Sequence, residues 1–283
     1  MSRKKPLVTL GLVQMSCEDS PQRNLDRALS SINKASQAGA QVICLQELFR
    51  SRYFCQTNEQ KYFELAEAVP GPTTEVLSRV AKEKSLVIVA SLFEKDQDRY
   101  YNTACVMDAD GKFLGKYRKV HIPDDLKNYY SELFYFRPGD LGFPVFETKY
   151  AKIGVQVCWD QWFPEGARAL AMKGAEIIFY PTAIGWQVDG IPELGKKEYE
   201  AWLTVQKGHA ISNTIFVAAT NRTGVEGHLQ FWGSSFVSGP FGEILGQVSH
   251  DKEENLIVTC DLGKITEVRK DWPFLKCRRP FEN

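Results

Sequence analysis

Short apolar runs rich in β-branched residues recur along the 283-residue chain and alternate with amphipathic segments. Runs of this kind predict strands, and their alternation with helical patterns predicts a mixed sheet system of the α/β or α+β class. One run, Leu86–Ala90, is apolar at every position, so both faces of its strand must be covered. This requirement favours layered sheets over an open, one-sided sheet.

Turn residues bound the apolar runs and set the expected elements. Strands are predicted at Leu7–Met15, Val42–Leu45, Leu86–Phe93, Thr103–Met107, Ile153–Cys158, Glu176–Tyr180, Ile215–Thr220, Ser234–Ser238 and Asn255–Asp261. Helices are predicted at about Gln22–Ala38, Thr73–Lys84, Pro164–Lys173 and Gly195–Asn213. Hairpins are predicted at Asp108–Gly111 and Gly239–Gly242, and long loops at Val120–Gly142 and Ile184–Lys197. No repeat or linker divides the chain, so residues 1–283 are expected to form a single domain.

Charge and hydropathy argue against several classes of partner. Lys plus Arg and Asp plus Glu each number 35, so the formal charge is zero and nothing indicates nucleic acid or an anionic membrane. No segment reaches the roughly 18 apolar residues of a membrane span. After the apolar Leu7–Met15, a signal peptide would need small residues, but Cys17, Glu18 and Asp19 follow. These features predict a cytoplasmic protein.

Seven scattered cysteines without a CxxC pair indicate neither a disulfide framework nor a zinc site, and no metal is expected. A cysteine on an apolar strand is usually a small core residue, and Cys44 fits that interpretation. Cys158 differs because Trp159 and Asp160 directly follow it and end the apolar run. A side chain at that position can point out of the sheet.

Three apolar segments end in chemically useful residues: Glu47, Lys119 and Cys158. Each alone has an ordinary explanation, such as a solvated charge or a core thiol. Together they supply a nucleophile, a base and a cation on strand ends, which are rigid mounts for reactive groups.

The surrounding segments resemble the nitrilase superfamily and, within it, the N-carbamoylputrescine amidohydrolases. The matching segments run from near one terminus to near the other: Leu45–Phe49 (LQELF), Tyr117–Asp124 (YRKVHIPD), Phe134–Asp140 (FYFRPGD), Val157–Glu165 (VCWDQWFPE), Phe179–Gly185 (FYPTAIG), Gly208–Ala210, Asn221–Arg222 and Arg278–Pro280. The two long strings around Cys158 and Tyr180 are the most specific. The resemblance implies a four-layer αββα sandwich and an amidohydrolase that uses no cofactor.

The resemblance also implies roles for individual residues. Cys158 attacks the carbonyl-type carbon, and Glu47 acts as general base and then as acid. Lys119 and the backbone N–H of Trp159 stabilise the oxyanion, and Glu132 is a second glutamate that orients the substrate nitrogen and the lysine. Family members form homodimers or larger assemblies, here through the Pro164–Lys173 helix and a tail at about residues 272–283.

The implied substrate, a small carbamoyl amine, carries a primary ammonium at its far end. Such a group needs a carboxylate or aromatic faces, and the candidates are Asp125 first, then Asp124, Tyr53, Tyr130 and Trp186, with Phe54 beside them. The segment Asp124–Tyr130 replaces the family's usual glycine-rich turn, which leaves chain-length specificity open.

Other substrates and other classes of protein remain open alternatives. Carbamoyl-amino-acid hydrolases, including β-ureidopropionase, need cations for a distal carboxylate, and Arg137 or Arg222 would serve. An ω-amidase of the same superfamily is a further alternative. A papain-like protease, built on Cys158, His209 and Asn213, and a non-catalytic nitrilase-like binding protein are the rivals from other classes.

Overall fold

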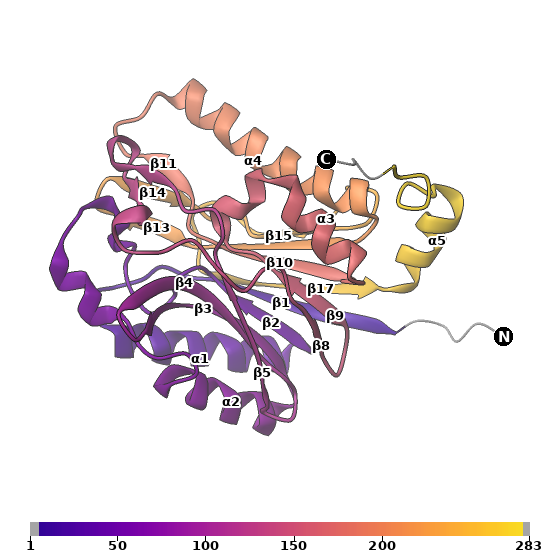
Figure 1. Cartoon of the computed structure of the whole chain (residues 1–283), viewed down its shortest axis with the longest axis horizontal. Coiled ribbons are helices and arrows are strands. Elements are labelled where there is room, and N and C mark those ends of the chain that lie inside the picture. Colours follow the sequence, from indigo (N-terminus) through magenta and orange to yellow (C-terminus); the bar gives the residue numbers. More distant parts are fainter. Residues whose placement is uncertain (1–5, 280–283) are drawn as a thin grey trace.

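The computed structural model describes residues 6–279, in which two six-stranded sheets pack face to face between two helical layers (Figure 1). Helices α1 (Pro21–Gln37) and α2 (Pro72–Lys84) cover one sheet, and α3 (Pro164–Met172) and α4 (Pro192–Asn213) cover the other (Figure 1). Helix α5 (Gly263–Asp271) follows the last strand. This arrangement confirms the predicted four-layer αββα sandwich.

The first sheet has the order β17-β1-β2-β3-β4-β5, with β1, β2 and β3 parallel and the remaining pairs antiparallel. Its strands are β1 (Leu7–Gln14), β2 (Val42–Leu45), β3 (Val87–Asp96), β4 (Arg99–Met107), β5 (Phe113–Arg118) and β17 (Glu254–Asp261). The antiparallel pairing of β4 with β5 confirms the hairpin predicted at Asp108–Gly111.

The second sheet has the order β16-β15-β12-β10-β9-β8, with β9, β10 and β12 parallel. Its strands are β8 (Val145–Glu147), β9 (Lys152–Val155), β10 (Ile177–Thr182), β12 (Phe216–Asn221), β15 (Phe236–Ser238) and β16 (Ile244–Gln247). Two smaller sheets are formed by β6 (Asp124–Asp125) with β7 (Tyr130–Ser131), and by β11 (Gly185–Gln187), β13 (Thr223–Glu226) and β14 (Leu229–Trp232).

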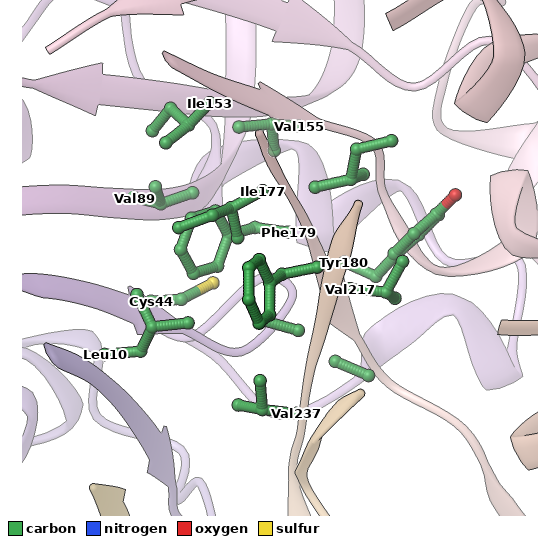
Figure 2. Close-up of a cluster of buried hydrophobic side chains, with 14 of the residues drawn as sticks. Leu10, Cys44, Val89, Ile153, Val155, Ile177, Phe179, Tyr180, Val217 and Val237 are labelled. Carbon is green, nitrogen blue, oxygen red and sulfur yellow. The ribbon is translucent and has the colours of Figure 1, made fainter. Parts of the chain in front are cut away.

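Strand β3 buries both faces, as its apolar sequence requires. Val87 and Val89 join the cluster between the two sheets, whereas Ile88 and Ala90 join the cluster beneath α1 and α2. Cys44 lies in the inter-sheet cluster, as predicted for a core thiol (Figure 2). Full burial of an aliphatic or aromatic side chain is worth about 1.5–3 kcal/mol, so this double-faced packing is a main source of stability.

Several predicted boundaries were wrong, and proline placement explains some of them. Helices α1, α2 and α4 each begin at a proline, whose fixed φ suits the first helical position. The predicted loop Ile184–Lys197 therefore loses its second half to α4, and β11 occupies part of its first half. Helix α5 was not predicted. Pro280 and residues 281–283 of the predicted tail lie outside the described residues.

The strand predicted to end at Cys158 stops at Val155, and Cys158 instead opens the 3-10 turn η5 (Cys158–Trp162). The predicted loop Val120–Gly142 holds only short pieces, among them η3 (Leu126–Asn128) and η4 (Glu132–Phe134). In the described part of the chain, none of the helices has the length and apolar character to cross a membrane.

The ends of strands from both sheets meet at one edge of the sandwich. Glu47 follows β2 by two residues, and Lys119 directly follows β5. The backbone N–H of Glu47 donates to the carbonyl of Thr182, the last residue of β10, at 3.4 Å. This bond joins the edge that carries Glu47 to the edge that carries the Cys158 turn.

Candidate active site

Lys119 lies at the centre of the site, fully buried between two carboxylates. Its Nζ donates to Glu47 Oε1 at 2.8 Å and to Glu132 Oε2 and Oε1 at 2.6 and 2.8 Å. Burial alone would lower the pKa of Lys119, but Glu132 and Glu47 hold it well above its ordinary value. The fold therefore brings three predicted site residues together around a permanent positive charge.

Glu47 uses only one of its carboxylate oxygens. Oε1 accepts from Lys119 and from Asn102 Nδ2, the latter at 2.7 Å. Oε2 is buried and has no hydrogen-bond partner within residues 6–279. A buried acceptor left without a donor is costly, so this oxygen is suited to receive a proton from a reacting group.

Glu132 carries the excess charge of the cluster, since two buried carboxylates face one ammonium. Burial raises the pKa of Glu132 to about 7, Lys119 opposes the rise, and Glu47 adds to it. Its partners are Lys119 and the hydroxyl of Tyr53, which donates at 2.7 Å. A carboxylate in this state can hold or release a proton near neutral pH.

Cys158 begins the turn η5 with a φ of 43°, a left-handed conformation that is uncommon outside glycine. Its side chain is buried, and Sγ lies 3.8 Å from the carbonyl oxygen of Ala183. Burial and the charge of Glu47 raise the thiol pKa well above its ordinary value, while Lys119 opposes this. The resting group is thus a thiol that needs a base, and the base must be close.

Asp160 holds the turn that presents Cys158. Its Oδ2 accepts from the backbone N–H of Val157 at 3.0 Å and from the Tyr117 hydroxyl at 2.7 Å. Its Oδ1 accepts from the backbone N–H of His121 at 3.0 Å. Asp160 was not predicted as a site residue, although it stands in the motif that contains Cys158.

Trp159 is the second residue of η5. The first N–H groups of a helical turn have no partner inside it, and they point toward the space before the turn.

The predicted aromatic residues divide between the charged cluster and its rim. Tyr53 is buried and bonded to Glu132, and its ring centroid lies 5.7 Å from that of Tyr130. The Tyr130 hydroxyl accepts from the backbone N–H of Gly185 at 3.1 Å. Burial raises the pKa of Tyr130, and the charges of Cys158 and Glu47 raise it further. Phe54 packs instead in an aromatic cluster with Phe93.

Asp125 and Asp124 lie in the loop that departs from the family pattern. The Asp125 carboxylate accepts from the backbone N–H of Asn128 at 3.2 Å and from its Nδ2 at 2.6 Å, which caps η3. Asp124 is exposed. Within the described residues, neither carboxylate forms a hydrogen bond or ion pair with Lys119, Glu47 or Cys158.

Trp186 lines a cavity of about 810 Å³ together with Asn128, Glu198, Tyr199 and His250. Glu198 makes no hydrogen bond or ion pair in the described structure, and partial burial raises its pKa. The charge of Glu198, like that of Cys158, contributes to the raised pKa of Tyr130. The cavity therefore carries an unpaired carboxylate that was not predicted from the sequence.

The arginines proposed for a carboxylate substrate are not available at the cluster. Arg222 is fully buried and bonded to Glu226 and to backbone carbonyls. Arg137 is exposed and lines a different cavity with Asp98 and Arg99. His209, the histidine of the protease alternative, is 2.7 Å from the carbonyl oxygen of Gln161. Within residues 6–279, no three His, Cys, Asp or Glu side chains are grouped to hold a metal.

Comparison with known proteins gives consistent matches along the whole chain. The carbon-nitrogen hydrolase family model matches residues 9–270. An N-carbamoylputrescine amidase from Solanum lycopersicum is 43% identical over 99% of this chain and 95% of its own length. A citrullinase from Francisella tularensis is 39% identical over 96% of each chain. The crystal structure of a carbon-nitrogen hydrolase from Helicobacter pylori superposes with a TM-score of 0.93 at 41% identity, covering 97% of this chain and 96% of that one.

Proposed function

The chain belongs to the carbon-nitrogen hydrolase family, and we propose that it hydrolyses N-carbamoylputrescine to putrescine, carbon dioxide and ammonia. The observation that carries the chemistry is the buried Lys119 between Glu47 and Glu132, beside the Cys158 thiol. The Solanum lycopersicum relative supports the choice of substrate. The whole chain, residues 1–283, is taken as one domain of this kind.

In the first half of the reaction, Cys158 Sγ attacks the carbamoyl carbon as its proton passes to Glu47. The unpartnered Oε2 of Glu47 supports this assignment. The thiol pKa is raised, so proton removal must accompany attack rather than precede it. Collapse of the tetrahedral adduct breaks the bond to the terminal nitrogen, Glu47 returns the proton, and ammonia leaves.

Lys119 and the backbone N–H of Trp159 stabilise the oxyanion of the adduct. Both donors belong to rigid parts of the fold, so little reorganisation accompanies the reaction. Loss of one such donor typically costs about 3–4 kcal/mol of transition-state stabilisation. Glu132 keeps Lys119 protonated and oriented, since it holds Nζ with both oxygens.

In the second half, water replaces the sulfur. Glu47 takes a proton from the attacking water, the bond between Sγ and the carbamoyl carbon breaks, and the thiol is restored. The released carbamate loses carbon dioxide to give putrescine. Overall, one carbamoyl amine and one water give one amine, one carbon dioxide and one ammonia.

The far ammonium of the substrate is held by a carboxylate outside the charged cluster. Asp125 is the first choice and Asp124 the second, because both lie in the loop Asp124–Tyr130. Glu198 is a third carboxylate, supported by its place in the cavity that Trp186 lines and by its lack of a partner. Trp186 and Tyr130 supply aromatic surface for the methylene chain and the cation.

The test compares specificity constants for ammonia release from four substrates: N-carbamoylputrescine, N-carbamoyl-β-alanine, L-citrulline and a neutral carbamoyl-alkylamine. We expect a preference for N-carbamoylputrescine over N-carbamoyl-β-alanine of at least ~100-fold, because one mispaired buried charge costs several kcal/mol. Preference for the carboxylate substrate would overturn the proposed substrate. Higher activity on L-citrulline than on N-carbamoylputrescine would indicate that the natural substrate is a carbamoyl amino acid.

The variants Asp125→Asn, Asp124→Asn and Glu198→Gln then locate the ammonium. The responsible change weakens the diamine substrate selectively and leaves the neutral carbamoyl-alkylamine almost unaffected. Asp125→Asn removes an acceptor of the η3 cap as well, so its thermal stability is measured beside its kinetics. If none of the three variants discriminates, the aromatic side chains near Tyr53 hold the amine.

The proposal extends to the setting of the enzyme. Formation of putrescine would place the reaction in polyamine synthesis. Seven free cysteines support a reducing compartment such as the cytoplasm. Self-association is supported by apolar side chains exposed on α3 and near the C-terminal segment, namely Met172, Phe241, Trp272 and Phe274. Light scattering of the wild type and Trp272→Ser would test this assembly.

A further inference from the structure

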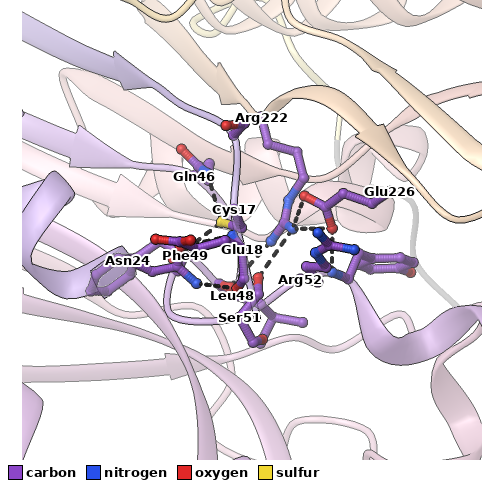
Figure 3. A network of polar contacts seen from close by, with 12 residues as sticks. Cys17, Glu18, Asn24, Gln46, Leu48, Phe49, Ser51, Arg52, Arg222 and Glu226 are labelled. Atoms are coloured by element: carbon purple, nitrogen blue, oxygen red, sulfur yellow. Dashed lines mark hydrogen bonds and ion pairs between the residues drawn. The ribbon is translucent and has the colours of Figure 1, made fainter. Parts of the chain in front are cut away.

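A second buried ion pair, Arg222–Glu226, contacts the segment that begins at Glu47 and continues through Leu48 and Ser51 (Figure 3). Arg222 Nη1 lies 3.0 Å from each carboxylate oxygen of Glu226, and both side chains are almost fully buried. The pair comes from β12–β13, more than 170 residues along the chain from Glu47. Neither side chain bonds to Lys119, Glu47 carboxylate or Glu132 directly.

One arm of the pair holds the backbone of Glu47. Arg222 Nη2 donates to the carbonyl oxygens of Glu47 and Leu48 at 2.6 and 3.2 Å, and Nη1 donates to that of Ser51 at 3.2 Å. Leu48 has a φ of 49°, a left-handed conformation unfavourable for leucine. The guanidinium thus fixes a turn that would otherwise relax and carry Glu47 with it.

The other arm reaches Glu132 through one intermediate residue. Glu226 Oε2 accepts from the backbone N–H of Tyr53 at 2.6 Å. The hydroxyl of the same Tyr53 donates to Glu132 Oε1 at 2.7 Å. The Arg222 guanidinium also lies over the Tyr53 ring, 5.9 Å from its centroid. The pair therefore connects Glu47 to Glu132 from outside, while Lys119 connects them from inside.

We propose that the Arg222–Glu226 pair is a positioning element that fixes Glu47 and Glu132 relative to each other across Lys119. The inference rests on the proposed roles of Glu47 and Glu132 in hydrolysis. Buried ion pairs contribute little net stability compared with apolar replacements, so stability alone explains this pair poorly. Its bonds to the Glu47 backbone and to Tyr53 match a role in geometry, and misplacement by about 1 Å can cost on the order of 100-fold in rate.

Glu226→Gln tests the ion pair itself, Tyr53→Phe tests the arm to Glu132, and a third variant serves as a matched control. Glu226→Gln removes the charge opposite Arg222 but keeps an amide oxygen near the Tyr53 N–H. Tyr53→Phe removes only the hydroxyl and keeps the buried ring, so it should fold. Glu94→Gln weakens another buried pair, Arg118–Glu94, which has no bond to Glu47 or Glu132.

We expect Glu226→Gln and Glu94→Gln to lower the melting temperature by similar amounts. Only Glu226→Gln should lower kcat on N-carbamoylputrescine, on the order of 100-fold, with KM changed far less. Tyr53→Phe removes a donor that favours the charged form of Glu132. The pKa of Glu132 then rises, and the acid limb of the kcat/KM profile moves to higher pH.

A Glu226→Gln enzyme with wild-type kcat and a lowered melting temperature would make the pair purely structural. An unmoved acid limb in Tyr53→Phe would overturn the arm to Glu132, and this result is available even if Glu226→Gln does not fold. Both outcomes are distinct from failure of the proposed function, which appears as activity in Cys158→Ala or as no activity of the wild type on any of the four substrates.

Discussion

Arg118 and Lys119 are neighbours in the chain, yet they belong to two very different charged clusters. Arg118 donates to Glu94, Asp96 and Asp140 at 2.6–3.1 Å and lies over the Tyr101 ring at 3.7 Å. Lys119 donates through Nζ to Glu47 and Glu132. The side chains of consecutive residues in a strand point to opposite faces. At the end of β5, Arg118 therefore points to partly exposed carboxylates, here called the rim cluster, and Lys119 points to the buried carboxylates, here called the interior cluster.

The two clusters differ in solvent access more than in charge. With Lys116, the Arg118 cluster has two cations and three carboxylates, and the Lys119 cluster has one cation and two carboxylates. Asp96 and Asp140 are each 48% exposed, and the pKa values of the rim carboxylates are lowered. In the interior, burial raises the pKa of Glu132 to about 7 and leaves Glu47 Oε2 without a partner. Both clusters have one more carboxylate than cations. In the partly exposed Arg118 cluster the pKa values of the carboxylates are nevertheless lowered, whereas in the buried Lys119 cluster the pKa of Glu132 is raised.

The largest expected effect is at the thiol beside the interior cluster. Cys158→Ala and Cys158→Ser should lose turnover on the order of 10⁴-fold or more, because alanine has no nucleophile and the serine hydroxyl is far harder to ionise than the thiol. Ammonia release measures the loss, and unchanged circular dichroism shows that the fold is intact. Near-normal activity in Cys158→Ala would end the proposed mechanism.

Labelling of the thiol needs a control that the structure supplies. Six of the seven cysteines are buried and Cys277 is exposed. Iodoacetamide is therefore expected to modify Cys277 before Cys158, and a Cys277→Ser background separates the two. Burial and the raised thiol pKa make Cys158 the slower of the two to react.

The next effect concerns the reaction rate, which should depend on Lys119 and not on Arg118. Lys119→Ala should lower the rate of acylation by roughly 10²–10³, with a smaller change in substrate binding, since its proposed role is in the transition state. Glu47→Gln should be nearly inactive, because an amide cannot accept the proton. Single-turnover kinetics separate acylation from binding, and a Lys119→Ala enzyme altered only in KM would remove the role proposed for Lys119.

A substitution in the rim cluster should lower the free energy of unfolding and leave kcat almost unchanged. Arg118→Gln leaves the buried Glu94 without its main partner, and breaking a buried pair from one side typically costs about 3–5 kcal/mol. Urea unfolding measures this loss, and kcat per folded molecule should stay near the wild-type value. A fall in kcat comparable to that of Lys119→Ala would show that the rim and interior clusters are coupled.

The sequence was informative where local pattern carries the structure. Most of the longer strands and four of the helices could be predicted, because apolar periodicity and proline positions are local signals. Strand β5 (Phe113–Arg118) was missed, since it contains no continuous apolar run. Strands such as β6, β7 and β11 have two or three residues, too few for any periodicity. The residues Glu47, Lys119 and Cys158 could be proposed because each follows an apolar run within a distinctive motif.

Residues that act through distant contacts could not be assigned. Asp160 accepts from Tyr117, 43 positions away, and Asn102 donates to Glu47, 55 positions away. Arg222 was considered for substrate binding because its charge is visible in the sequence, whereas its bonds to Glu226 and to the Glu47 carbonyl are not. Asp125 was chosen for its charge in the same way, and its bond to Asn128 became visible only in the fold.

The smallest expected effect is on how the free energy of unfolding depends on pH, which should differ between the two clusters. Glu132 has a raised pKa, about 7 against an ordinary 4.5, so the folded state holds an extra proton between these values. Its contribution to stability is fully present below about pH 4.5 and is lost as pH rises to about 7. Glu94 has a lowered pKa, so its contribution is present above its ordinary value and is lost as pH falls through the lowered one.

The free energy of unfolding should therefore decline on both sides of about pH 5, for a different reason on each side. The rise in the pKa of Glu132 from 4.5 to about 7 corresponds to at most roughly 3 kcal/mol. Glu132→Gln should flatten the decline toward neutral pH and keep the acid limb, and Glu94→Gln should do the reverse. Urea unfolding at intervals between pH 3 and pH 8 measures both slopes. If both variants altered the same slope, solvent access would not be what separates the two clusters, because the carboxylates would then titrate as one group.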